Sequence, residues 1–107
     1  MTPPKEIIDF LVALDPPFET ELETENEGEL TAHRIMMLFA QYFGANHGSF
    51  TKKQLARLGE WLSSSVATGG TLENAVSTCF LEHSHQLKVN RIIAPFLSHD
   101  AKAKTHA

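Results

Sequence analysis

The segment Glu29–Phe43, with the sequence ELTAHRIMMLFAQYF, is the most apolar part of the chain and decides its fold. Apolar residues recur around almost the whole circumference of the helix that this segment would form. They leave only a narrow polar edge of His33, Arg34 and Gln41. Because this pattern is typical of a helix covered by neighbours on most sides, we expect residues 30–43 to form the centre of the fold. Gly44 follows as a natural C-terminal stop.

The segments on either side of this central helix also show helical periodicity, and none shows the alternation of a half-buried strand. We therefore predict an all-α fold, a single compact bundle of five to six short helices that run antiparallel where the loops are short. Residues 100–107 are expected to form a frayed tail. The other predicted helices are Pro4–Leu14, a loose helix over Phe18–Asn26, a helix from Lys52 to the Gly69-Gly70 break, a helix capped by Thr71, and Lys88 to about His99.

The predicted helix start at Lys52 has the strongest local signal in the chain. Thr51 and Gln54 are spaced as a capping box, in which each side chain accepts a hydrogen bond from the backbone amide of the other residue. Phe50 and Leu55 occupy the positions of a hydrophobic staple around this cap. The sequence therefore predicts this boundary to the residue.

Length and composition limit the class of protein. With 107 residues the chain is expected to form one domain over residues 1–107, and its one cysteine, Cys79, excludes an internal disulfide. No signal-peptide pattern follows Met1, so the cytoplasm is the expected location. The longest apolar run, residues 35–40, is far shorter than the roughly 20 residues of a transmembrane helix, and no membrane span is expected.

Charge is divided unevenly along the chain. Residues 1–30 contain nine acidic residues and one basic residue, whereas residues 31–107 contain eight basic and four acidic residues. An acidic surface repels nucleic acid and attracts a basic partner, and the basic residues elsewhere are scattered, so we expect no nucleic-acid ligand. Much of the negative charge comes from a run of alternating glutamates, namely Glu19, Glu21, Glu23, Glu25, Glu27 and Glu29.

The glutamate run has two interpretations that the sequence leaves open. It is either a solvated face or a surface that binds a protein partner. Two apolar residues could extend such a surface: Leu81, opposite the predicted buried stripe that contains Cys79, and Met37, on the narrow polar edge of the central helix. The predicted partner-binding residues are therefore the six glutamates together with Met37 and Leu81.

Metal and catalytic sites have weaker support. The glutamates of residues 23–27 match the first positions of an EF-hand loop, but the twelfth position, which needs a bidentate carboxylate, is Arg34. Cys79 and His83 are four residues apart and could share a zinc ion, yet the other histidines complete no compact set of four ligands. We predict no metal, cofactor or catalytic residue. A metal-binding or catalytic protein that uses Cys79 and the histidines is the alternative.

Two segments of the chain are informative together: Glu25-Asn26-Glu27-Gly28-Glu29-Leu30, before the central helix, and Cys79-Phe80-Leu81-Glu82, before a closing helix that contains Ala94-Pro95. These segments resemble those of a family of small uncharacterised bacterial helical domains. The resemblance covers most of residues 6–97 and implies an all-helical bacterial protein without a known active site. It also implies a likeness to immunity proteins, which neutralise a toxin made by the same or a neighbouring cell. We therefore expect a non-enzymatic protein-binding module, of immunity or inhibitor type, that acts through its acidic surface.

Overall fold

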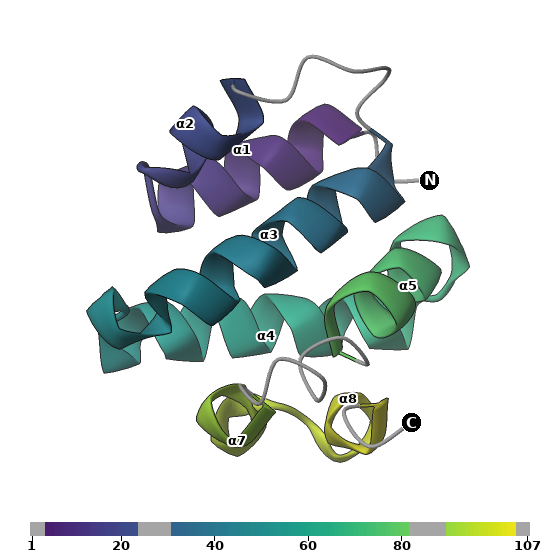
Figure 1. The fold of residues 1–107 in the computed structure, drawn as a ribbon. Coiled ribbons are helices and arrows are strands. Elements are labelled where there is room, and N and C mark those ends of the chain that lie inside the picture. The colour runs from purple at the N-terminus through teal and green to yellow at the C-terminus, as the bar shows by residue number, and fades with distance from the viewer. Residues whose placement is uncertain (1–3, 24–30, 82–89, 105–107) are drawn as a thin grey trace.

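The computed structural model describes residues 4–23, 31–81 and 90–104, which form helices joined by short turns (Figure 1). These ranges contain no strand, so the predicted all-α class is confirmed. They contain seven α-helices rather than five to six: α1 (Pro4–Leu14), α2 (Phe18–Glu23), α3 (Ala32–Asn46), α4 (Lys52–Thr68), α5 (Gly70–Val76), α7 (Asn90–Ile93) and α8 (His99–Lys104). Three further helical segments adjoin them: the 3₁₀-helix η1 (His47–Ser49), the π-helix η2 (Ser77–Leu81) and the 3₁₀-helix η3 (Ala94–Phe96).

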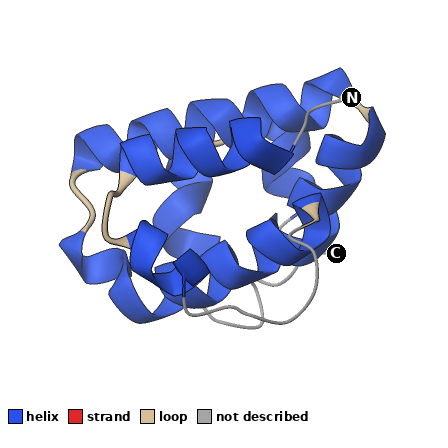
Figure 2. Ribbon diagram, turned by 90° about the horizontal axis from the view of Figure 1, so that it is seen from above, coloured by secondary structure: helices blue, strands red, loops and turns tan. Residues whose placement is uncertain are grey.

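Helix α3 lies between two groups of helices (Figure 1). It packs against α1 and α2 on one side and against α5 and η2 on the other. Helix α4 contacts α1, α5, α8 and η3 and so joins the N-terminal helices to the C-terminal ones. Figure 2 shows the same helices as one body from above, with principal dimensions of 35 × 31 × 23 Å.

An aromatic cluster fills the space between these helices. Phe18 of α2, Phe39 and Phe43 of α3 and Phe80 of η2 have no exposed surface. The rings of Phe39 and Phe18 form a T-shaped pair with centroids 5.0 Å apart, and Phe39 stacks with Phe80 at 5.6 Å. Such aromatic pairs stabilise a core beyond the area that they bury, so Phe39 links both groups of helices through α3.

The polar edge of α3 differs in part from its predicted position. Met37, which is 46% exposed, and Gln41 lie on this edge as expected. His33 and Arg34 are instead half-buried. The helix begins at Ala32, and residues 29–30 of the predicted start lie outside the described ranges.

Gly44 does not end α3, contrary to the prediction. The helix continues to Asn46 and passes into η1. A glycine that terminates a helix commonly adopts a positive φ, and among the described residues only Gly69 and Gly70 do so. The last turn of α3 is stabilised by side chains instead, because the Asn46 amide donates to the Tyr42 carbonyl at 2.9 Å.

Both predicted boundaries of α4 are confirmed. The Thr51 hydroxyl accepts a hydrogen bond from the Gln54 amide at 3.1 Å, and the Gln54 side chain accepts one from the Thr51 amide at 2.8 Å. The helix ends at Thr68, before Gly69 and Gly70, whose φ angles of 79° and 82° are readily adopted only by glycine. The capping role predicted for residue 71 is wrong, since α5 begins at Gly70 with Gly69 in the N-cap position.

Leu81 is fully buried, so the prediction that it is exposed is wrong. The prediction extends the α-helical period of about 100° per residue from the start of α5. From Ser77 to Leu81, however, the chain forms a π-helix, whose i to i+5 hydrogen bonds require more residues per turn. Each residue therefore rotates less about the axis, and Leu81 reaches the same buried side as Val76 and Phe80.

The C-terminal part of the chain forms two short helices rather than one that ends near His99. Helix α7 passes into η3, which contains Pro95 and ends at Phe96. The Ser98 amide donates to the Ser63 hydroxyl of α4 at 2.9 Å, and the Ser98 hydroxyl accepts from the Ala101 amide at 3.3 Å at the start of α8. Ala101 is fully buried. The predicted frayed tail is therefore wrong for residues 100–104, which form α8. Residues 105–107 of that tail lie outside the described ranges, as do residues 88–89, where the last helix was predicted to start.

Helix α4 and η3 approach so closely at Gly59 that no side chain fits between them. A Cβ atom at Gly59 would lie 2.8 Å from the carbonyl carbon of Phe96 and nearer still to its carbonyl oxygen. These are backbone atoms, so rotation of a side chain cannot relieve the overlap. Gly59 therefore sets the distance between α4 and the C-terminal segment.

The close approach at Gly59 predicts that Gly59→Ala destabilises the fold by about 1–3 kcal/mol, as overpacking does elsewhere. Helix propensity alone predicts the opposite sign, by about 1 kcal/mol. Urea unfolding followed by circular dichroism measures the difference. The matched control is Gly48→Ala, because a Cβ at Gly48 would meet no atom within 4 Å. A Gly59→Ala protein as stable as the wild type would contradict the packing described above.

The capping box predicts that Thr51→Ala costs about 1 kcal/mol of folding free energy, because the Gln54 amide loses its acceptor. Thr20→Ala is the control, since Thr20 is an exposed residue within α2. Equal unfolding midpoints for the two variants would show that the cap contributes nothing.

Candidate functional site

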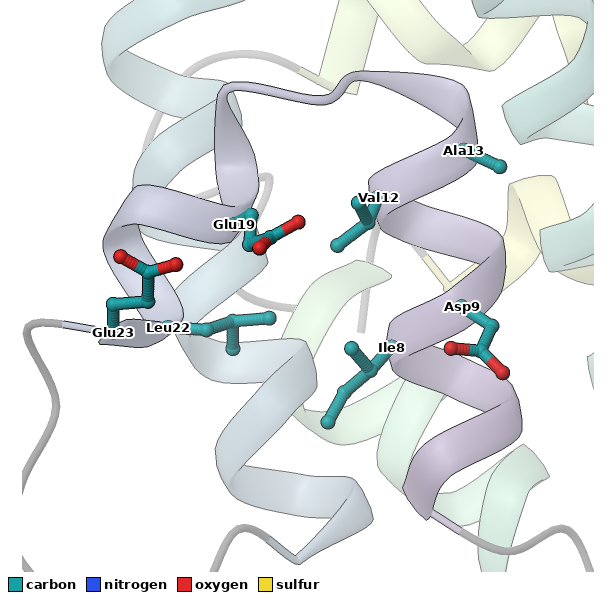
Figure 3. A pocket seen from close by; sticks show the side chains of 7 residues that line it. All are labelled: Ile8, Asp9, Val12, Ala13, Glu19, Leu22 and Glu23. Atoms are coloured by element: carbon teal, nitrogen blue, oxygen red, sulfur yellow. The ribbon is translucent and has the colours of Figure 1, made fainter.

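A hollow of about 560 Å³ lies between α1 and α2 (Figure 3). Both helices contribute to it, and the turn of residues 15–17 joins them at one end. We call this hollow the acidic groove and define it by the residues that line it: Ile8, Asp9, Val12, Ala13, Glu19, Leu22 and Glu23.

The floor of the acidic groove is apolar. Ile8 and Val12 point from α1 toward α2, and Leu22 points back from α2 (Figure 3). Ile8 and Val12 are half-buried, because the core face of α1 is formed by the neighbouring positions Ile7 and Leu11. Ile8 and Val12 are not among the residues predicted to bind a partner. Their signal is present, however, as two apolar residues four positions apart beside the core stripe.

The rim of the acidic groove carries carboxylates from both helices. Asp9 lies on α1, and Glu19 and Glu23 lie on α2, where a spacing of four residues places them on one side of the helix. All three side chains are exposed. None of the described residues that line the groove is basic, so the electrostatic potential in the groove is negative.

The structure separates the predicted partner-binding residues. Glu19 and Glu23 line the acidic groove, whereas Glu21 is exposed on another side of α2, where its charge acts on Tyr42. Met37 is exposed on α3 and does not line the groove. Leu81 is buried in the core. The remaining predicted residues, Glu25, Glu27 and Glu29, lie outside the described ranges.

A hydrogen-bond network around Asp15 fixes the C-terminal end of α1, and with it one end of the groove. The Tyr42 hydroxyl of α3 donates a hydrogen bond to Asp15 Oδ2. From α4, the Gln54 side-chain amide donates to the Leu14 carbonyl at 2.9 Å and to Asp15 Oδ1 at 3.4 Å. The backbone carbonyl of Asp15 accepts from the Phe18 amide at 3.0 Å and so begins the turn into α2.

A second hollow, of about 280 Å³, lies where α1 meets α4. The rings of Phe10 and Trp61 stack there with centroids 4.6 Å apart, and Arg57, Glu60 and Ser64 complete its lining. Because one basic and one acidic side chain line it, this hollow has no dominant charge. It is therefore a weaker candidate for recognising a charged partner than the acidic groove.

The alternative site around Cys79 is only partly described. Cys79 is 7% exposed, so its thiol is shielded from solvent. The histidines nearest to it in sequence, at 83 and 85, lie outside the described ranges. Within the described ranges, the His, Cys, Asp and Glu side chains form no group of three or more that could hold a metal ion.

We compared the chain with protein-family models, curated proteins and solved structures, and no match was found in any of the three. The resemblance to bacterial helical domains stays a prediction. No helix in the described part of the chain has both the length and the hydropathy to cross a bilayer.

The Asp15 network predicts how stability changes with pH. Burial raises the pKa of the Tyr42 hydroxyl above its ordinary value, and the hydrogen bond to Asp15 and the charges of Asp15 and Glu21 raise it further. The unfolded chain therefore releases this proton first, near pH 10. Below that pH the contribution of Tyr42 to stability is complete, and it is lost as the pH rises beyond 10.

Tyr42 is the one tyrosine of the chain, so the near-ultraviolet absorbance of tyrosinate reports this residue alone. We expect native protein to resist ionisation at a pH where urea-unfolded protein has already titrated. Stability should also fall less steeply with pH in Tyr42→Phe than in the wild type, a comparison that cancels the titration of lysines. Coincident titration curves for native and unfolded protein would contradict the network.

Proposed function

We propose that the protein is a non-enzymatic protein-binding module that binds one partner stoichiometrically through the acidic groove, in the manner of an immunity protein or an inhibitor. The observation that supports this proposal is the combination of an apolar floor with carboxylates contributed by both helices. Removal of water from the half-buried side chains of Ile8 and Val12 would supply affinity. The carboxylates on the rim would select a basic partner and exclude an acidic one.

The charge of the N-terminal helices supports a basic partner as well. Together α1, α2 and their turn carry one basic residue, Lys5, against six acidic ones: Glu6, Asp9, Asp15, Glu19, Glu21 and Glu23. A field of one sign over a concave surface raises the rate of association with a partner of the opposite sign. We also predict that the partner contacts the other residues expected from the sequence: Glu21, Glu25, Glu27, Glu29 and Met37.

The proposal predicts that Glu19→Lys/Glu23→Lys weakens binding of a basic partner by slowing association about tenfold or more at low salt. The wild type and the variant are immobilised as baits, and each is used to capture binding proteins from an extract of the source organism. A protein that the wild-type bait retains is purified, and its stoichiometry and its association rate over a range of salt concentrations are measured by surface plasmon resonance. The association rate with wild type should fall as salt rises.

The matched control is Glu6→Lys/Glu60→Lys. It makes the same change in net charge at exposed positions that do not line the acidic groove, and Glu6, like Glu19, lies in the first turn of its helix. Circular dichroism and urea unfolding establish that both variants are folded. If the retained protein binds both variants equally, or carries no net positive charge, the proposal is wrong.

A further inference from the structure

We infer that the element bound in the acidic groove is one short amphipathic helix of the partner, with an apolar stripe toward the floor and lysine or arginine on both flanks. This inference rests on the proposed function and adds the form of the ligand. It follows from the shape of the groove, its length and the position of its carboxylates.

The shape of the groove favours a helix over an extended peptide. Its two walls are α1 and α2, and side chains rather than free backbone groups line it. An extended peptide gains much of its affinity by pairing with an exposed strand edge, and no strand exists in the described part of the chain. A helix needs no such pairing, because its backbone is satisfied internally and its side-chain ridges fit the trough between two helices.

The lengths of the walls set the size of the bound helix. Helix α1 has 11 residues and α2 has six, which correspond to about 16 Å and about 9 Å at the rise of an α-helix. A helix of about two to three turns covers this length. It presents three or four apolar side chains at spacings of three and four residues, enough to cover Ile8, Val12 and Leu22.

The carboxylates define the flanks of the bound helix. Glu19 and Glu23 are four residues apart on the α2 side, and Asp9 lies on the α1 side. An apolar stripe over the floor therefore has carboxylates near both of its edges. Basic residues on both flanks of the stripe would pair with them, whereas acidic residues there would be repelled.

A second copy of the chain fits this description less well. Helix α4 is the described helix with the most basic residues, Lys52, Lys53 and Arg57, but its apolar stripe of Leu58 and Leu62 is fully buried in its own core. It cannot present that stripe to another molecule without unfolding. Among the described helices α4 therefore does not supply the occupant, and we assign the occupant to a different protein.

The test uses synthetic helices in place of the unidentified partner. The probe is a peptide of about twelve residues with leucines aligned on one face and lysines on both flanks, and a side-chain staple on the far face holds it helical because isolated helices of this length are marginal. Two comparison peptides have the same staple. One has the same composition with the leucines dispersed around the helix, and the other has glutamates in place of the lysines.

Isothermal titration calorimetry should show the aligned lysine peptide binding with one-to-one stoichiometry, at least about tenfold more tightly than either comparison peptide. Glu19→Lys/Glu23→Lys should weaken its binding about tenfold or more, and Val12→Gln, on the floor, should do so about fivefold. Val66→Gln is the control for the floor variant, since Val66 is another half-buried valine on a helix and does not line the groove. It should leave binding unchanged.

Equal binding of the aligned and dispersed peptides, or equal binding to wild type and Glu19→Lys/Glu23→Lys, would overturn the inference. So would sedimentation that shows a dimer abolished by Glu19→Lys/Glu23→Lys, because the occupant would then be a second copy. If the peptides fail while a basic protein still binds in a manner that depends on Glu19 and Glu23, the helical ligand is wrong and the proposed function stands. Failure of both tests rejects both proposals.

Discussion

The hydrogen bonds at Asp15 connect three helices at one point, and the position of the N-terminal part of the molecule depends on them. Tyr42 of α3 and Gln54 of α4 both bind the C-terminal end of α1. The Gln54 side chain also accepts a hydrogen bond from the Thr51 amide, so one residue both completes the capping box of α4 and holds α1. The Asp15 carbonyl also accepts the Phe18 amide, so these groups lie at the turn where the chain enters α2 and the acidic groove ends.

Helix α2 shows a conflict between local preference and its role in the fold. With six residues it is far shorter than the length at which an isolated helix is stable, and Glu19 and Glu23 repel each other along one side. Burial of Phe18 and Leu22 in the aromatic core compensates for both effects. A fold that only needed to close its core would gain from lysine at one of these positions. The two carboxylates therefore fit the role proposed above for this surface, the binding of a basic partner.

Local signals in the sequence determine the parts of the fold that were predicted correctly. The bounds of α1, the capping box at Thr51 and the break at Gly69-Gly70 each depend on residues within one or two turns. The burial of Leu81 could not be predicted in this way, because it results from a change of helix type that no single residue of Ser77–Leu81 specifies. The glutamates of the groove were identified from their charge. Its floor was missed, since only the packing of α2 against α3 shows which side of α1 remains uncovered.

Helix α1 carries the groove on one flank and the ring of Phe10 on another, where Phe10 stacks with the one tryptophan of the chain, Trp61, at an interplanar angle of 14°. The hydrogen bonds at Leu14 and Asp15 hold the C-terminal end of the helix between these two sites. A rotation of α1 about its axis would move the Phe10 ring relative to the indole of Trp61. Such a rotation would therefore change the fluorescence of Trp61, and the native chain would report it without a label.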